Sequence, residues 1–168
     1  GADNIFMGRC SGCNITSGGC NVYLGAYAGR CGGNSDDNIA IGRQAGQALG
    51  GDKNIAIGQL AAYCCGSGSS GLIAIGEQAG AKNNTNRNIL IGSYAGKKVT
   101  TGCENIAIGS CTMASGSDAT GHRNLAIGRG TLCRVTSGSY NIALGNIAGN
   151  QLQTGACNIF LGSYAAAC

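Results

Sequence analysis

The amino-acid sequence predicts an all-β fold, a β-solenoid or β-roll of about ten coils with short parallel strands. Three observations lead to this prediction. A repeat of about 17 residues fills the chain, short runs within it carry β-branched residues at every second position, and glycine recurs at fixed phases. A repeat of this length cannot bury its own apolar face, so successive units must stack on one another. We therefore expect residues 1–168 to form a single repeat domain without separate caps.

One glycine marks each repeat and closes its alternating run. Neighbouring copies of this glycine lie 16 to 19 residues apart, so individual coils gain or lose a residue or two in their turns. A second glycine often lies three residues before the motif asparagine, as Gly18 and Gly138 do. Glycine at fixed phases predicts corners that need positive φ or a close approach between coils. The strand-closing glycines are Gly8, Gly25, Gly42, Gly58, Gly76, Gly92, Gly109, Gly128, Gly145 and Gly162.

The run before each of these glycines is predicted to be a strand. Residues 38–42 and 105–109 both read Asn-Ile-Ala-Ile-Gly, an alternation typical of a short strand. Stacked strands are about 4.8 Å apart, so ten coils would make a rod about 45–50 Å long. A second, weaker apolar position predicts another extended segment. It is occupied by Ile15, Ala48, Val99, Val135 and Leu152.

Asparagine begins the run in nine coils, and Leu72 replaces it in the remaining one. Stacked amides can form hydrogen bonds along the rod, each donating to one neighbour and accepting from the other. A row that binds sugars or ions is the alternative. We favour the structural ladder, because an asparagine beside a turn needs no ligand to explain it. The row consists of Asn4, Asn21, Asn38, Asn54, Asn88, Asn105, Asn124, Asn141 and Asn158.

The residue between the two aliphatic positions of each run is never charged. We expect this residue to face away from the coil interior, where a solvated strand face would normally be polar. A continuous exposed apolar stripe marks an interaction surface, and we expect it to pack laterally against another copy. The alternative is that coil curvature or a covering loop hides these residues. The residues of this stripe are Phe6, Tyr23, Ala40, Ala56, Ala74, Leu90, Ala107, Ala126, Ala143 and Phe160.

The composition excludes several partners. Charged residues make up 11% of the chain and the net charge of +4 is dispersed, so the basic stripe needed for nucleic-acid binding is missing. No apolar run approaches the ~20 residues that span a bilayer. The chain begins at Gly1 without a methionine, so we expect a processed product or a segment of a longer protein.

Eleven cysteines predict disulfide bonds in an oxidising, extracellular setting. Cys13 and Cys31 lie in adjacent coils at nearly the same phase, which favours a bond between them. A head-to-tail filament, in which coil ten docks on coil one of the next copy, would bring Cys168 close to the neighbour's Cys13. Cys10 and Cys13 have the spacing of zinc ligands, but no matching second pair accompanies them.

The core motif resembles two sets of known repeats. Residues 54–61 and 141–149 are similar both to the S-x-A-I-G-x-x-A coils in the heads of trimeric autotransporter adhesins and to repeats of phage tail fibres. Residues 101–109 and 154–162 are closer to the T-G-x-x-N-x-A-I-G-x-x-A repeats of phage tail fibres. The resemblance implies a β-roll or β-solenoid fibre, often a homotrimer, that serves attachment outside the cell.

Other functions fit the sequence less well. The I-G-x-x-A-G stretch matches one hexapeptide of the left-handed β-helix acyltransferases, but only one of three per coil, and the sole histidine, His122, has no evident catalytic setting. An ice-binding rod would carry a threonine row, and that position is mixed. Residues 32–37 alone resemble a calcium-binding RTX loop. We assign no catalytic, cofactor-binding or metal-binding residue.

We therefore expect a structural subunit or segment of an extracellular filament or fibre rather than an enzyme. Its partners would be copies of itself, stacked head-to-tail or laterally, together with a cell-surface receptor or glycan. A homotrimeric phage tail-fibre or adhesin-head shaft is the alternative.

Overall fold

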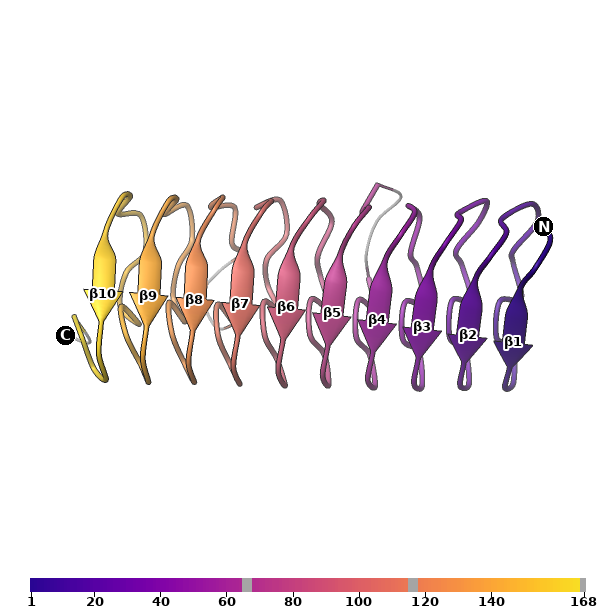
Figure 1. Cartoon of the computed structure of the whole chain (residues 1–168), viewed down its shortest axis with the longest axis horizontal. Coiled ribbons are helices and arrows are strands. Elements are labelled where there is room, and N and C mark those ends of the chain that lie inside the picture. The colour runs from indigo at the N-terminus through magenta and orange to yellow at the C-terminus, as the bar shows by residue number, and fades with distance from the viewer. Residues whose placement is uncertain (65–67, 115–117, 167–168) are drawn as a thin grey trace.

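A computed structural model of the chain confirms the all-β solenoid (Figure 1). The structure describes residues 1–64, 68–114 and 118–166. Ten three-residue strands form one parallel sheet, in which the spatial order of the strands is their order in the sequence. The strands are β1 (Ile5–Met7), β2 (Val22–Leu24), β3 (Ile39–Ile41), β4 (Ile55–Ile57), β5 (Ile73–Ile75), β6 (Ile89–Ile91), β7 (Ile106–Ile108), β8 (Leu125–Ile127), β9 (Ile142–Leu144) and β10 (Ile159–Leu161). Within the described ranges, no helix is long and apolar enough to cross a membrane.

The strands pair so that equivalent residues of successive repeats lie opposite each other. The middle residue Ala40 pairs with Ala56, and the same correspondence extends from β1 to β10. The uneven spacing of the anchor glycines does not disturb this register, because the extra residues lie outside the strands. The sheet is therefore a regular ladder along the rod.

Backbone hydrogen bonds also join the coils outside the sheet. A tight turn follows each anchor glycine, as in the 3.2 Å bond from the Ala45 N–H to the Gly42 carbonyl. Beyond this turn, the Gly29 N–H donates to the Ala45 carbonyl of the next coil at 3.0 Å. The predicted second extended segment forms only one isolated parallel bridge in the described chain, between Val99 and Ala119. Coil-to-coil bonding thus continues through turns rather than through a second sheet.

The second apolar position is confirmed, but in the third coil it is occupied by Leu49. Leu49 is fully buried and its N–H donates to the Gly46 carbonyl, just as the Val99 N–H donates to the Gly96 carbonyl. The prediction of Ala48 was therefore wrong by one residue. Each of these turns contains two residues with positive φ, and the inward-pointing residue comes three positions after the second of them. In the third coil that second residue is Gly46, so the inward-pointing residue is Leu49.

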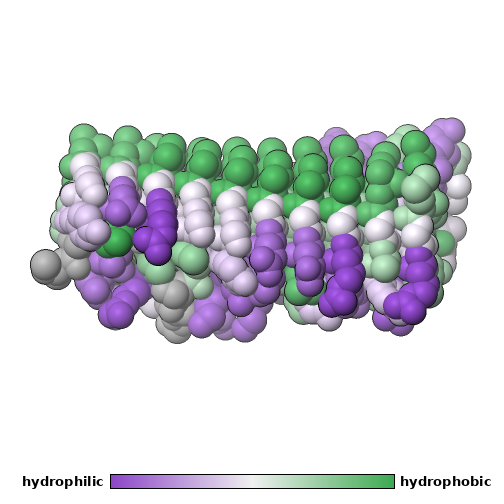
Figure 2. All heavy atoms as spheres, turned by 90° about the horizontal axis from the view of Figure 1, so that it is seen from below, coloured by the Kyte–Doolittle hydropathy of each residue, from purple (hydrophilic) through white to green (hydrophobic). Residues whose placement is uncertain are grey.

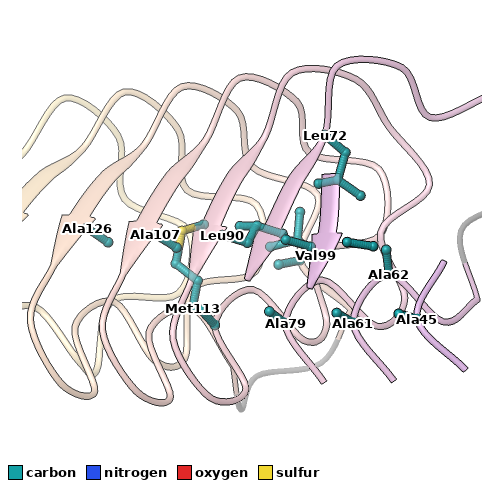
Figure 3. Packing of buried hydrophobic residues seen from close by; sticks show 14 of the residues in the cluster. Ala45, Ala61, Ala62, Leu72, Ala79, Leu90, Val99, Ala107, Met113 and Ala126 are labelled. Carbon is teal, nitrogen blue, oxygen red and sulfur yellow. The ribbon is translucent and has the colours of Figure 1, made fainter. Parts of the chain in front are cut away.

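The middle residue of each strand points into the coil, so the prediction that it faces outward was wrong. Ala40 and Ala126 are fully buried, whereas Ile41 and Ile127, the next residues in the same strands, are 36% and 39% exposed. The coil is narrow, and the larger side chains of its core come mainly from the turns. Figure 3 shows this packing, with Met113 and Val99 beside the alanines.

Turn residues and middle strand residues compensate each other in volume. The large middle residue Leu90 lies opposite Gly96, where an added Cβ atom would lie 2.5 Å from the Leu90 side chain. In the following coils the middle residue is alanine, and the position of that glycine is taken by Met113 or Leu132, both buried. In these coils either the strand or the turn supplies the large central side chain, whereas at Gly149 it comes from Leu132 and Phe160 of the adjacent coils.

The predicted asparagine ladder is confirmed. The Asn124 N–H and Nδ2 donate to Asn105 Oδ1 at 2.9 and 3.1 Å, and Asn141 makes the same two bonds to Asn124 Oδ1 at 3.0 Å. Asn124 Nδ2 also donates to the Gly138 carbonyl of the next coil at 2.9 Å. At the interruption, the Leu72 backbone N–H still donates to Asn54 Oδ1. The ladder fixes the start of each strand beside the corner.

Candidate interaction surface

Two parallel rows of aliphatic side chains cover the outer face of the sheet. They come from the first and third residue of each strand, because strand side chains alternate between the two faces. The first row is Ile5, Val22, Ile39, Ile55, Ile73, Ile89, Ile106, Leu125, Ile142 and Ile159. The second is Met7, Leu24, Ile41, Ile57, Ile75, Ile91, Ile108, Ile127, Leu144 and Leu161. We call these two rows the aliphatic face.

The aliphatic face is continuous and carries no polar side chain from the strands. Figure 2 shows it as an unbroken hydrophobic band along the rod. Its size follows from the strand spacing: ten strands and two rows give a strip of roughly 500 Å² per copy. A patch of this size is at the upper end of what monomeric proteins expose and approaches the share of one partner in a stable interface. The face therefore has the dimensions of a protein contact.

An additional ladder of side-chain acceptors runs along the corner before the strands. Asp36 accepts from the Gly19 N–H of the preceding coil at 2.7 Å, and Asp52 accepts from the Asp36 N–H at 2.9 Å. Ser70 Oγ then accepts from the Asp52 N–H at 3.1 Å, and Asn86 Oδ1 accepts from the Ser70 N–H at 2.8 Å. Residues of three chemical types thus share one structural role.

His122 belongs to this acceptor ladder. Its Nδ1 accepts from the Cys103 N–H at 3.1 Å, and its own N–H donates to Ser139 Oγ at 3.0 Å. The Cys103 thiol also contacts Nδ1 at 3.1 Å. Sequence reasoning left this histidine without a role. The missing signal was a short acceptor side chain two residues before the motif asparagine in several coils.

Next to the acceptor ladder lies a row of residues, one per coil, that is charged in six of the ten coils. Glu104 Oε2 accepts from Arg123 Nε at 2.7 Å, and Oε1 lies 3.5 Å from Arg87 Nη1 on the other side. Arg123 Nη1 also donates to the Tyr140 hydroxyl at 2.6 Å. The hydrogen bond from Arg123 is the main reason that the pKa of Glu104 is lowered. A single carboxylate thus joins two cations that lie one coil to either side of it.

Two hollows lie on the surface of the rod, each at a coil that has a glycine where the neighbouring coils have a side chain. The first, of about 300 Å³, is lined by Asp52, Lys53, Ser70, Gly71 and Arg87. The second, of about 220 Å³, is lined by Cys111, Arg129, Gly130, Cys133, Ile147 and Asn150. In each hollow, a glycine has no side chain, whereas the residues at the same position in the two neighbouring coils have one. The first hollow lies in the charged row and the second at the opposite turn.

No disulfide bond forms among the nine cysteines of the described ranges, and the predicted bond between Cys13 and Cys31 is not formed. The Asn14 N–H donates to the Arg30 carbonyl, which places Cys31 over Asn14 rather than over Cys13; Asn14 Nδ2 lies 3.9 Å from the Cys31 Sγ. The two cysteines therefore differ in phase by one residue. Cys168 lies outside the described residues. Across the described ranges, no group of three His, Cys, Asp or Glu side chains could hold a metal ion.

The sequence matches no known family model, no curated protein and no solved structure at a significant level. Fold and surface define this chain as a β-solenoid repeat protein with one aliphatic face.

Proposed function

We propose that this chain is a structural subunit or segment of an extracellular fibre whose copies associate laterally through the aliphatic face. The observation that carries the proposal is the double row of outward aliphatic side chains, from Ile5 to Leu161, without a polar strand residue. Away from the ends of the rod, Ile41, Ile127 and Ile142 of this face are 36%, 39% and 37% exposed in the isolated chain. Covering the face would remove a continuous apolar surface of the rod from water.

A second copy of the chain is the partner that this face fits best. Its side chains form ridges that repeat at the strand spacing of about 4.8 Å over the length of the rod. Another copy presents ridges with the same repeat, so the contacts made by one coil are repeated by every coil. A globular partner would match such a surface over only a few coils. The absence of charge on the face also means that two copies meet without repulsion.

The number of copies depends on how the two rows are shared. Two copies can pack face to face, and three can pack around a common axis, which is the homotrimeric shaft implied by the resemblance to tail fibres and adhesin heads. That resemblance also supports an attachment role outside the cell. Head-to-tail stacking is a further arrangement that we propose. β1 and β10 are the two edge strands of the sheet, so β1 of another copy could pair in parallel with β10 and continue the sheet.

Sedimentation velocity of the purified chain tests the lateral contact. The test variant carries Ile57→Lys and Ile108→Lys, two charges on the aliphatic face. The matched control carries Gln59→Lys, an exposed position just beyond β4. We expect dimers or trimers for the parent and the control at micromolar concentrations, and monomers with unchanged circular dichroism for the double variant. A monomeric parent, or a double variant that associates like the parent, would contradict the proposal.

A further inference from the structure

The hollow at Gly71 interrupts a row of alternating charge. The row runs Asp37, Lys53, Gly71, Arg87 and Glu104, one residue per coil at the corner before the strands. Lys53 and Arg87 therefore flank a position that has neither a side chain nor a charge. Opposite charges at neighbouring coils attract, and a negative group is what the alternation lacks at Gly71.

The same row shows how a carboxylate is held at such a position. Glu104 lies between Arg87 and Arg123, with one carboxylate oxygen towards each guanidinium. Gly71 has the same relation to Lys53 and Arg87, one coil to either side. Its backbone conformation is also that of Glu104, with φ of 68° compared with 58°. A carboxylate entering the hollow would thus occupy the place that the Glu104 carboxylate occupies two coils away.

The other lining residues indicate a ligand that carries hydroxyl groups beside its carboxylate. Ser70 Oγ accepts from the Asp52 N–H, which leaves its own hydroxyl hydrogen available for donation into the hollow. Asp52 uses Oδ1 to accept from the Asp36 N–H, and its second carboxylate oxygen is an acceptor for hydroxyl groups. Asp52 would also repel a densely charged polyanion, because the lining has only one net positive charge.

We propose that this hollow binds the carboxylate of a sugar acid in an acidic glycan, held between Lys53 and Arg87 with hydroxyl contacts to Ser70 and Asp52. Gly71 is the residue that makes room for it: an added Cβ atom would have only the Arg87 side chain within 4 Å, at 3.8 Å. The inference rests on the attachment role proposed above and gives that role a ligand class. The site lies within a single copy, outside the aliphatic face.

Binding of a short oligogalacturonate to the chain, immobilised at low density, tests the site. Galacturonic acid, acetate and a neutral galactose oligomer are the comparison ligands. The key variant is Gly71→Glu, which supplies the carboxylate from the chain itself. Lys53→Ala removes one of the two cations, and Lys82→Ala, which removes an exposed lysine at another corner, is the matched control. Sedimentation of each variant is measured in parallel.

We expect binding of the acidic oligomer that weakens with salt, and no binding of the neutral one. Gly71→Glu should reduce the affinity at least about tenfold, Lys53→Ala by about fivefold or less, and Lys82→Ala not at all. Equal effects of Lys53→Ala and Lys82→Ala, or unchanged binding by a folded Gly71→Glu variant, would overturn the site. Binding of acetate as strong as that of galacturonic acid would show a simple anion site and overturn the sugar assignment. All variants should associate like the parent, so loss of association would count against the fibre and not against this site.

Discussion

A Cβ atom placed on Gly76 would lie 2.6 Å from the carbonyl carbon and oxygen of Gly92, its counterpart in the next coil. The same close approach recurs along the column of anchor glycines from Gly8 to Gly145. Gly162 differs, because nothing lies within 4 Å of its Cβ position. Glycine is therefore required in this column by stacking as well as by its positive φ.

Gly76→Ala and Gly162→Ala should consequently differ in cost. Both glycines have positive φ, 126° and 111°, so both substitutions introduce backbone strain. Only Gly76→Ala also forces two coils apart. We expect Gly76→Ala to destabilise the fold by about 3 kcal/mol or more, and Gly162→Ala by about 1–2 kcal/mol. Urea unfolding followed by circular dichroism measures both, and equal costs would show that strain alone explains the column.

The sequence predicted the period, the strands and the asparagine ladder, but it did not predict which strand face is buried. Alternation in the sequence shows that a segment is a strand, but it identifies the buried face only when the other face is polar. Here both faces of the strand are apolar. The larger Ile side chains were expected inside. The narrow coil instead accommodates Ala56 or Ala107 in the strand and takes its larger core residues, such as Leu49 and Met113, from the turns.

The acceptor ladder and the hollow at Gly71 were missed for a different reason. The ladder uses Asp52, Ser70, Asn86 and His122 at one phase, so its common feature is hydrogen-bond acceptance rather than residue type. The hollow arises from the residues of three successive coils that meet in space. Neither feature can be recognised until the register between coils is known.

The direction of the strand faces can be tested with two lysines at adjacent positions. Ala107 is fully buried, whereas Ile108 belongs to the aliphatic face. We expect Ala107→Lys to prevent folding or cost about 4 kcal/mol or more, because it combines overpacking with a buried charge. Ile108→Lys should cost less than about 1 kcal/mol in the monomer and weaken association. Thermal unfolding monitored by circular dichroism distinguishes the two, and the reverse order would invalidate the face assignment.

The asparagine ladder predicts a strong effect of an isosteric change at Asn124. Asn124→Asp keeps the acceptor for Asn141 but removes the donor that reaches Asn105 Oδ1 and the Gly138 carbonyl. A buried carboxylate would then face two acceptors. We expect a loss of about 2–4 kcal/mol at pH 7, partly recovered in acid as the carboxylate is protonated. Asn158→Asp, at a partly buried position, is the control and should cost less; similar losses in urea unfolding would argue against the ladder.

Tyr23 predicts how stability changes at alkaline pH. Its ring stacks on Phe6 with 5.2 Å between centroids, and its hydroxyl donates to Asn21 Oδ1 at 3.2 Å. Burial raises the pKa of Tyr23 to about 12, so the folded chain keeps the neutral phenol at pH values where the unfolded chain has ionised it. The stability contributed by the neutral form is therefore complete below about pH 10 and is lost as the pH rises from about 10 to 12.

Removing the hydroxyl should remove this part of the pH dependence. At pH 8, Tyr23→Phe is expected to be less stable than the parent by about 0.5–1.5 kcal/mol, the value of one hydrogen bond. Above pH 10 the difference should shrink, because only the parent has a phenol whose ionisation favours unfolding. Urea unfolding midpoints of both proteins, measured from pH 8 to 11, provide the comparison. Parallel pH profiles would show that Tyr23 ionises equally readily in the folded and unfolded chains, contrary to its buried position in the second coil.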